Sequence, residues 1–229
     1  MVFPGFSTVA KKIFLAVTGL CLAGFISVHL AGNILLFIGP GAFNLYAHKL
    51  FGLGVLLYLA EIILLCIFSL HFFLAVYTQI VNWRARPKSY RKTRHQGKPS
   101  RLTYSSRSMI WTGLVIIIFT VLHVITFKYG PGIEEGYYTT IDGEKVRDLY
   151  RLVAESFRKE YYVFPYLAVM TVLGFHLKHA LWSGVHSLGC TNPRILPVFY
   201  LLSTVIAIAL GGGFFLLPLW FYFSGGTLL

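Results

Sequence analysis

Histidine is the residue type in this chain best suited to chemistry, because a neutral imidazole nitrogen can bind a metal ion or move a proton. The sequence contains eight histidines. Four of them lie one each within long apolar stretches: His29, His71, His123 and His176. A polar ring at membrane depth needs a partner, so these four are candidates for a functional site. The competing interpretation is hydrogen bonding between helices, which histidines also provide.

Position along the apolar stretches sorts the four histidines into two pairs. Depths are measured at about 1.5 Å per residue from the expected outer ends, at Gly39, Gly130, Lys49 and Glu160. His29 lies roughly 15 Å deep and His123 roughly 10 Å. His71 and His176 lie roughly 33 Å and roughly 24 Å deep. Two imidazoles at one level can bind a haem iron from opposite faces, so the pattern predicts two stacked haems b that transfer single electrons.

The spacing leaves one ligand position open. His179 follows His176 by three residues on nearly the same helical face, so either could be the ligand. Zinc fits less well, because it needs more ligands gathered in one cluster. The remaining histidines are expected at surface or interfacial positions: His48, His95 and His186. Three glycines could leave room for a macrocycle or allow close helix packing: Gly24, Gly32 and Gly174.

Composition places these histidines in a membrane protein. The 229 residues are 56% hydrophobic and 12% charged, with a mean hydropathy of +0.70. Soluble domains carry about 25% charged residues. The net charge of +12 is concentrated beside apolar segments, which favours topology control over nucleic-acid binding. The three cysteines are far apart and form no CxxC pattern, so they predict buried small side chains.

Five stretches are long enough to cross a hydrocarbon core of about 30 Å, which takes about 20 helical residues. They run from Lys11 to Ile38, Lys49 to Trp83, Ser108 to Tyr129, Tyr161 to Leu188 and Ile195 to Phe223. The expected fold is therefore an all-α membrane protein, a single domain over residues 1–229 in which five transmembrane helices enclose two haems. No cleavage pattern follows the first stretch, so it is expected to be retained rather than removed as a signal peptide.

Loop charge predicts the orientation of the bundle. Residues 84–107 carry nine Lys and Arg side chains and no acidic one, which is typical of a cytoplasmic loop. Residues 130–160 hold seven of the eight acidic residues and are expected outside. The N-terminus is then cytoplasmic. Within the outer segment we expect a turn-rich loop followed by a short amphipathic helix, with Leu149, Leu152, Val153 and Phe157 on one face. No internal repeat is recognised.

The sequence resembles a known family, the single-chain, two-haem cytochrome b subunit of succinate dehydrogenase and fumarate reductase. The resemblance covers nearly the whole chain and rests on five segments: "TGLCLAGFISVHLAGN", "LHFFLAVYTQIVNWRARPKSY", "VLHVITFKYG", "DLYRLVAESF" and "LGFHLKHALWSGVHSLG". In the family, the ligand of the fourth helix precedes a closing glycine by thirteen residues. Here that residue is His176, before Gly189. The resemblance pairs His29 with His123 and His71 with His176.

The resemblance implies the partners and the location of the chain. A flavoprotein subunit would hold the dicarboxylate active site, and an iron–sulfur subunit would exchange electrons with this chain. This chain would react with membrane quinone, menaquinone by the resemblance, in the bacterial cytoplasmic membrane as a multi-pass protein in contact with lipid. Arg84 and Arg86, at the end of the second helix, would contribute to docking of the iron–sulfur subunit or simply control topology.

Three residues are candidates for the quinone site. Asn44 and His48 are expected at the outer mouth of the second helix, and Glu61 within that helix, ten residues before His71. A carboxyl at bilayer depth is costly, so Glu61 has either a role in proton movement and quinone contact or a structural hydrogen bond. Some family members use a glutamate two residues before the fourth-helix ligand for proton transfer. That position is Gly174 here, so this proton path is not expected.

Two other functions fit part of the pattern. A two-haem cytochrome b of a hydrogenase or formate dehydrogenase would show similar histidines, although the segments "DLYRLVAESF" and "NWRARPKSY" favour the succinate family. A haemless anchor or transporter would use the histidines for packing or proton relay. Against this, the chain lacks the paired Gly/Pro-interrupted helices that transporters place at a midplane site.

Overall fold

The computed structural model describes residues 7–85 and 104–224, which are mostly helical. In chain order the helices are α1 (Thr8–Ile34), the 3-10 turn η1 (Leu35–Phe37), α2 (Pro40–Phe51), α3 (Val55–Ala85), α4 (Tyr104–His123), the π-helical turn η2 (Val124–Lys128), α5 (Leu149–Ser156), α6 (Glu160–Ser187) and α7 (Leu196–Ser224). Two short strands, β1 (Tyr138–Ile141) and β2 (Glu144–Arg147), precede α5.

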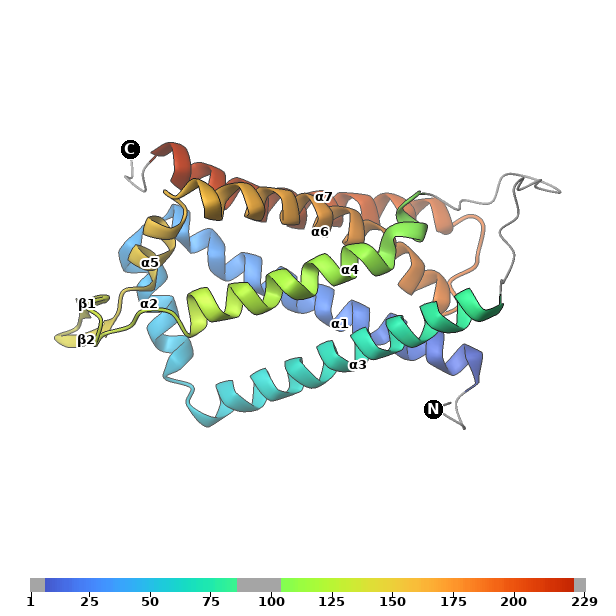
Figure 1. Ribbon diagram of the computed structural model, residues 1–229, viewed down its shortest axis with the longest axis horizontal. Helices are drawn as coiled ribbons and strands as arrows, with labels where there is room; N and C mark the ends of the chain where they lie inside the picture. Colours follow the sequence, from blue (N-terminus) through green and yellow to red (C-terminus); the bar gives the residue numbers. More distant parts are fainter. Residues whose placement is uncertain (1–6, 86–103, 225–229) are drawn as a thin grey trace.

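Four helical segments are long and apolar enough to cross a membrane: Val9–Phe37, Val55–Arg84, Ser108–Lys128 and Leu196–Ser224. Three of them match expected stretches within two residues, and Val55–Arg84 matches the end of the fourth, which confirms the prediction of a helical membrane protein. The fifth, α6, has 28 residues and packs along α1, α4 and α7 (Figure 1). Its length is therefore comparable, but His176, Lys178 and His179 make it less apolar than the other four.

The long helices run alternately in opposite directions, so the bundle has two different ends (Figure 1). One end carries α2, the β1–β2 hairpin, α5 and the last turns of α7, and we call it the cap end. The other end carries the start of α1 and the end of α3. The acidic segment 130–160 lies at the cap end, whereas most of the basic segment 84–107 is outside the described residues.

The expected start of the second membrane helix is wrong. Lys49 belongs to the separate helix α2, and α3 begins only at Val55. The chain breaks between them at Gly52 to Gly54, where Gly54 has a φ of +54° that favours glycine. The segment before Lys49, expected as outer loop, is thus helical from Pro40, and proline suits the first turn of a helix.

The cap end also contains a hairpin where a loop is expected. β1 and β2 pair antiparallel around Asp142 and Gly143, which have φ values of 51° and 86°. Two positive φ values match a tight hairpin turn, for which Asp-Gly is a strong sequence signal. A short helix, α5, lies within the segment where the amphipathic helix is expected. Leu152 and Val153 of α5, and Phe157 directly after it, are buried in the protein core.

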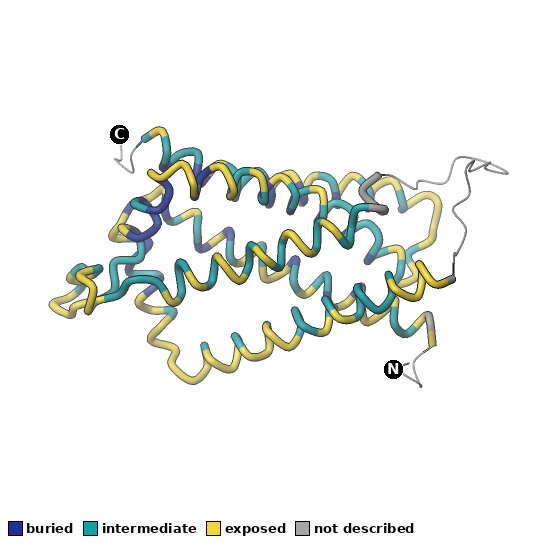
Figure 2. The backbone as a smooth tube through the Cα atoms, viewed as in Figure 1, coloured by how far each residue is buried: buried dark blue, intermediate teal, exposed yellow. Residues whose placement is uncertain are grey.

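The core lies mainly between α6, α7 and α1. Val163 and Phe221 are completely buried there, and Gly211 packs directly on Gly174, so the backbones of α6 and α7 approach closely. α3 contrasts with these helices, since none of its described side chains is buried (Figure 2). The surface of α3 is therefore exposed to whatever surrounds the bundle or binds against it.

Candidate functional site

Two of the candidate histidines face each other at the cap side of the bundle. His29 on α1 and His123 on α4 have ring centroids 5.8 Å apart and ring planes at 87°. Metal–imidazole nitrogen bonds are about 2 Å long, so two rings that bind one metal ion from opposite sides have centres about 6 Å apart. The observed separation fits a shared iron.

Aromatic side chains surround this cap-level pair. Those within ring-contact distance of one histidine or the other are Phe25, Phe119, Phe127, Phe214 and Tyr166. The Tyr166 hydroxyl also lies 3.0 Å from His123 Nδ1. The π-helical turn η2 follows His123 directly, and such turns occur often at functional sites. The surroundings are apolar, and Tyr166 holds one ring nitrogen of His123.

The other two histidines lie at matching depth nearer the opposite end. His71 is 16 residues from Val55, and His176 is 16 residues from Glu160. Each is therefore about 24 Å along its helix. The corrected start of α3 thus improves the agreement in depth between them. We call His71 and His176 the inner pair.

Each inner histidine is held by a threonine of a neighbouring helix. Thr18 Oγ1 on α1 lies 3.1 Å from His71 Nδ1, and Thr112 Oγ1 on α4 lies 2.9 Å from His176 Nδ1. Each threonine hydroxyl also donates to a carbonyl of its own helix, Phe14 and Met109 respectively. A hydroxyl has only one hydrogen, so while that hydrogen is donated to the carbonyl, the oxygen accepts a hydrogen bond from the imidazole. Nδ1 then carries the proton, and Nε2 keeps the lone pair that binds a metal.

This contact distinguishes the two candidates on α6. His176 is oriented by Thr112 and lies at a helix depth similar to that of His71, whereas the His179 side chain forms no hydrogen bond among the described residues. In residues 7–85 and 104–224, no three His, Cys, Asp or Glu side chains gather as a metal site. A haem iron takes only two ligands from the protein, and both histidine pairs have that number.

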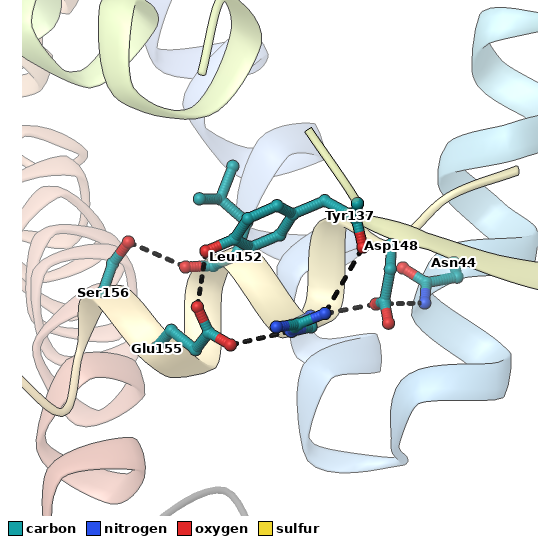
Figure 3. Close-up of polar contacts among 8 residues, drawn as sticks. Asn44, Tyr137, Asp148, Leu152, Glu155 and Ser156 are labelled. Atoms are coloured by element: carbon teal, nitrogen blue, oxygen red, sulfur yellow. Dashed lines mark hydrogen bonds and ion pairs between the residues drawn. The ribbon is translucent and has the colours of Figure 1, made fainter. Parts of the chain in front are cut away.

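The three quinone candidates lie in different surroundings. Asn44 is 2% exposed, and its side chain donates to Asp148 Oδ1 at 2.8 Å and accepts from the Tyr150 backbone N–H at 2.9 Å. Asn44 thus fastens α2 to the start of α5, with its side chain directed at Asp148 (Figure 3). His48 has a 43% exposed side chain that lies 4.0 Å from Glu144. Neither residue lies beside the cap-level histidines.

Glu61 is placed differently from the expectation of a deeply buried carboxyl. Its side chain is 32% exposed and forms an ion pair with Lys128 of η2. Glu61 is six residues into α3, about 9 Å along the helix. Its partner Lys128 follows His123 by five residues, about 7.5 Å along the helix toward the cap end. Sequence reasoning missed Lys128, although a lysine at the end of an apolar stretch is a signal for such a partner.

Two of the three glycines expected to accommodate a macrocycle lie instead in close packing contacts. Gly174 packs against Gly211, and a Cβ at Gly32 would meet the Tyr46 ring. Both therefore serve close packing. A Cβ at Gly24 would meet nothing within 4 Å. The glycines that lie against histidines are two others, Gly19 beside His71 and Gly113 beside His176.

A small pocket opens at the cap end, lined by both polar and apolar side chains. It is lined by residues of η2, the segment before β1, α5 and the start of α6, among them Thr126, Tyr137, Glu155, Lys159 and Tyr162. The Tyr137 hydroxyl points at Glu155 and donates to it at 2.5 Å (Figure 3).

No protein-family model, curated protein or solved structure matches this chain.

Proposed function

We propose that this chain is the membrane-anchor cytochrome b subunit of a succinate:quinone oxidoreductase, a succinate dehydrogenase or fumarate reductase. It would carry two haems b, one between His29 and His123 and one between His71 and His176. The observation that carries the proposal is that four helices each supply one histidine, at two levels, with a ring separation at the cap level and Nδ1 hydrogen bonds at the inner level that suit iron binding. A bis-histidine haem, when bound, supplies one-electron transfer and leaves no coordination position open to substrate.

The residues of this chain hold and orient the two groups. Thr18 and Thr112 hydrogen-bond to Nδ1 of His71 and His176, which leaves Nε2 of each ring free to bind iron. The Tyr166 hydroxyl forms a hydrogen bond with Nδ1 of His123. The apolar rings around His29 and His123 exclude water from the cap-level site. Electrons would enter from an iron–sulfur subunit at the non-cap end, and the dicarboxylate reaction would take place on a partner flavoprotein.

Five spans, with α6 as the fourth, would place the N-terminus in the cytoplasm of a bacterium and the cap end outside the cytoplasmic membrane. The basic residues 84–107 support this direction through the positive-inside rule. Arg84, in the last turn of α3, lies at the end where the iron–sulfur subunit would dock. Arg86 is outside the described residues.

We propose that quinone, menaquinone by family resemblance, reacts near Glu61 and Lys128. The pair lies between α3 and η2, both side chains are partly exposed, and Lys128 follows the cap-level His123 by five residues. A carboxylate and an ammonium beside a redox group can exchange the protons that accompany quinone chemistry. Asn44 and His48 fit this role less well, since one is fully hydrogen-bonded and the other is on the surface.

A reduced-minus-oxidised absorption spectrum of the purified complex tests the proposal. We expect haem b bands, reduction of the haem by succinate, and co-purification of a flavoprotein and an iron–sulfur protein. Haem b with a hydrogenase or formate dehydrogenase partner would place the chain in another oxidoreductase. Absence of haem from freshly purified protein would overturn the proposal and favour a haemless anchor.

A further inference from the structure

α1 and α4 contain the same short pattern of residues. Thr-Gly-Leu, four residues, Phe, three residues and His span residues 18–29 in α1 and residues 112–123 in α4. The threonine and histidine are 11 residues apart in both helices, which is close to three helical turns and places them on one face. The expectation of no internal repeat is therefore wrong at this scale. Five shared positions in twelve residues are easily overlooked without the structure.

The two copies make the same contacts. Thr18 holds Nδ1 of His71 on α3, and Thr112 holds Nδ1 of His176 on α6. The following glycine lies beside the ring in both copies. A Cβ at Gly19 would lie 3.0 Å from His71 Cε1, which is a tight approach, and one at Gly113 would lie 3.6 Å from His176 Cε1, which is an ordinary contact.

The far end of each copy is equivalent as well. Phe25 lies 5.5 Å from His29, and Phe119 lies 5.6 Å from His123, ring centre to ring centre. Each of the two helices thus supplies one cap-level histidine and, three turns earlier, a threonine for an inner histidine of the next long helix. The arrangement links the two levels through α1 and α4.

From this repeat we infer that Thr18 and Thr112 are the positioning residues of the inner haem, which they hold through the two histidines that bind it. The inference rests on the proposed function. Each threonine oxygen accepts a hydrogen bond from Nδ1–H while its own hydrogen is donated to a backbone carbonyl. This fixes the tautomer that leaves Nε2 free, sets the ring orientation and raises the basicity of the ligand. Both axial ligands of one haem are set in this way.

The effect should be specific to one haem. A more basic imidazole stabilises the oxidised iron, so loss of the hydroxyl acceptor should raise the reduction potential of the inner haem. Removal of such an outer partner changes metal affinity or activity by about 10- to 100-fold. We expect up to about a tenfold change in the reduction equilibrium, which is about 59 mV for a one-electron couple.

The test is a redox titration of both haems in the intact complex, with electron paramagnetic resonance of the oxidised state. The inner haem is assigned as the one lost in His71→Ala. Thr18→Val and Thr112→Val should each raise its potential or shift its resonance, or release it, and leave the cap-level haem unchanged. Thr18→Ser and Thr112→Ser, which keep the hydroxyl, should restore the wild-type values.

Thr204→Val is the matched control, because Thr204 on α7 also donates to a carbonyl one turn earlier. It should change neither haem. The inference is overturned if the valine variants leave the inner haem unchanged, if they shift both haems equally, or if the serine variants behave like valine. Wild-type protein without haem b would overturn the proposed function together with the inference, whereas an unresponsive inner haem would leave the proposed function intact.

Discussion

Lys128 of η2 and Glu61 of α3 form an ion pair between two segments of the bundle that otherwise pack loosely. Each side chain is 32% exposed, so the pair is reachable from the surroundings of the bundle. Charged groups within apolar spanning segments are costly unless they are paired, and they often mark functional sites. This pair is the strongest candidate in the described residues for a contact with quinone.

Removal of either charge should impair quinone reaction without loss of haem. We expect Glu61→Gln and Lys128→Met each to slow electron exchange between the cap-level haem and a quinone analogue by about tenfold or more, in keeping with loss of an acid–base group. Stopped-flow reoxidation of dithionite-reduced protein by quinone measures this. Glu144→Gln, a change in the exposed hairpin, is the control. Unchanged rates in both single variants would place the quinone elsewhere.

The two histidines of α6 should behave differently. His176→Ala should remove the inner haem, because Thr112 orients this ring and it lies at the same helix depth as His71. His179→Ala should retain both haems. Pyridine haemochrome analysis of the purified variants gives the content. Loss of haem from His179→Ala, with full content in His176→Ala, would reverse the assignment.

Close contact of α6 and α7 should be sensitive to a single methyl group. A Cβ at Gly211 would lie 3.0 Å from Gly174 Cα, a backbone atom that cannot move aside easily. We expect Gly211→Ala to destabilise the bundle by about 1–3 kcal/mol. Gly212→Ala is the matched control, because its Cβ would meet nothing within 4 Å. Thermal unfolding in detergent should show a lower midpoint for the first variant only.

The cap end should loosen in acid. The hydrogen bond donated by Tyr137, followed by that from Arg151, holds the pKa of Glu155 below its ordinary value of 4.5. A depressed pKa means that the ionised carboxylate stabilises the folded cap above pH 4.5, and this stabilisation is lost as the pH falls through the lowered value. The group is largely solvated, so the effect is local.

Hydrogen exchange of residues 137–156 as a function of pH measures this loosening. Exchange, corrected for its intrinsic pH dependence, should rise below pH 4.5 in wild type. Glu155→Gln, which cannot ionise, should lack that acid transition. A transition of equal size in both proteins would show that another group controls the cap.

Sequence alone predicted the helical membrane class and the placement of four histidines within long helices, because long apolar stretches and single polar residues inside them are strong signals. It misplaced the start of α3, since Lys49 and the apolar residues around it can belong either to a span or to α2. The hairpin was missed although Asp142-Gly143 signals it. Helix start errors matter here, because each residue moves a side chain by about 1.5 Å along the axis.

The contacts that refine the site could not be predicted from spacing. The hydrogen bonds of Thr18 and Tyr166 depend on how helices are rotated against each other, and a single sequence gives periodicity but not rotation. Asn44 illustrates the same limit, because its polar type suggested a ligand-binding role while its position gives it a structural one. Packing decides between such roles, and only the folded arrangement defines the packing.

We propose that imidazoles from four helices hold two haems at two levels, and haem b content per chain measures this most directly. We expect about two in wild type and about one in His29→Ala and in His71→Ala, with a different haem lost in each as judged by its potential. His48→Ala, on the exposed surface, should retain both. Equal haem content in wild type and in the His29 and His71 variants would contradict the account.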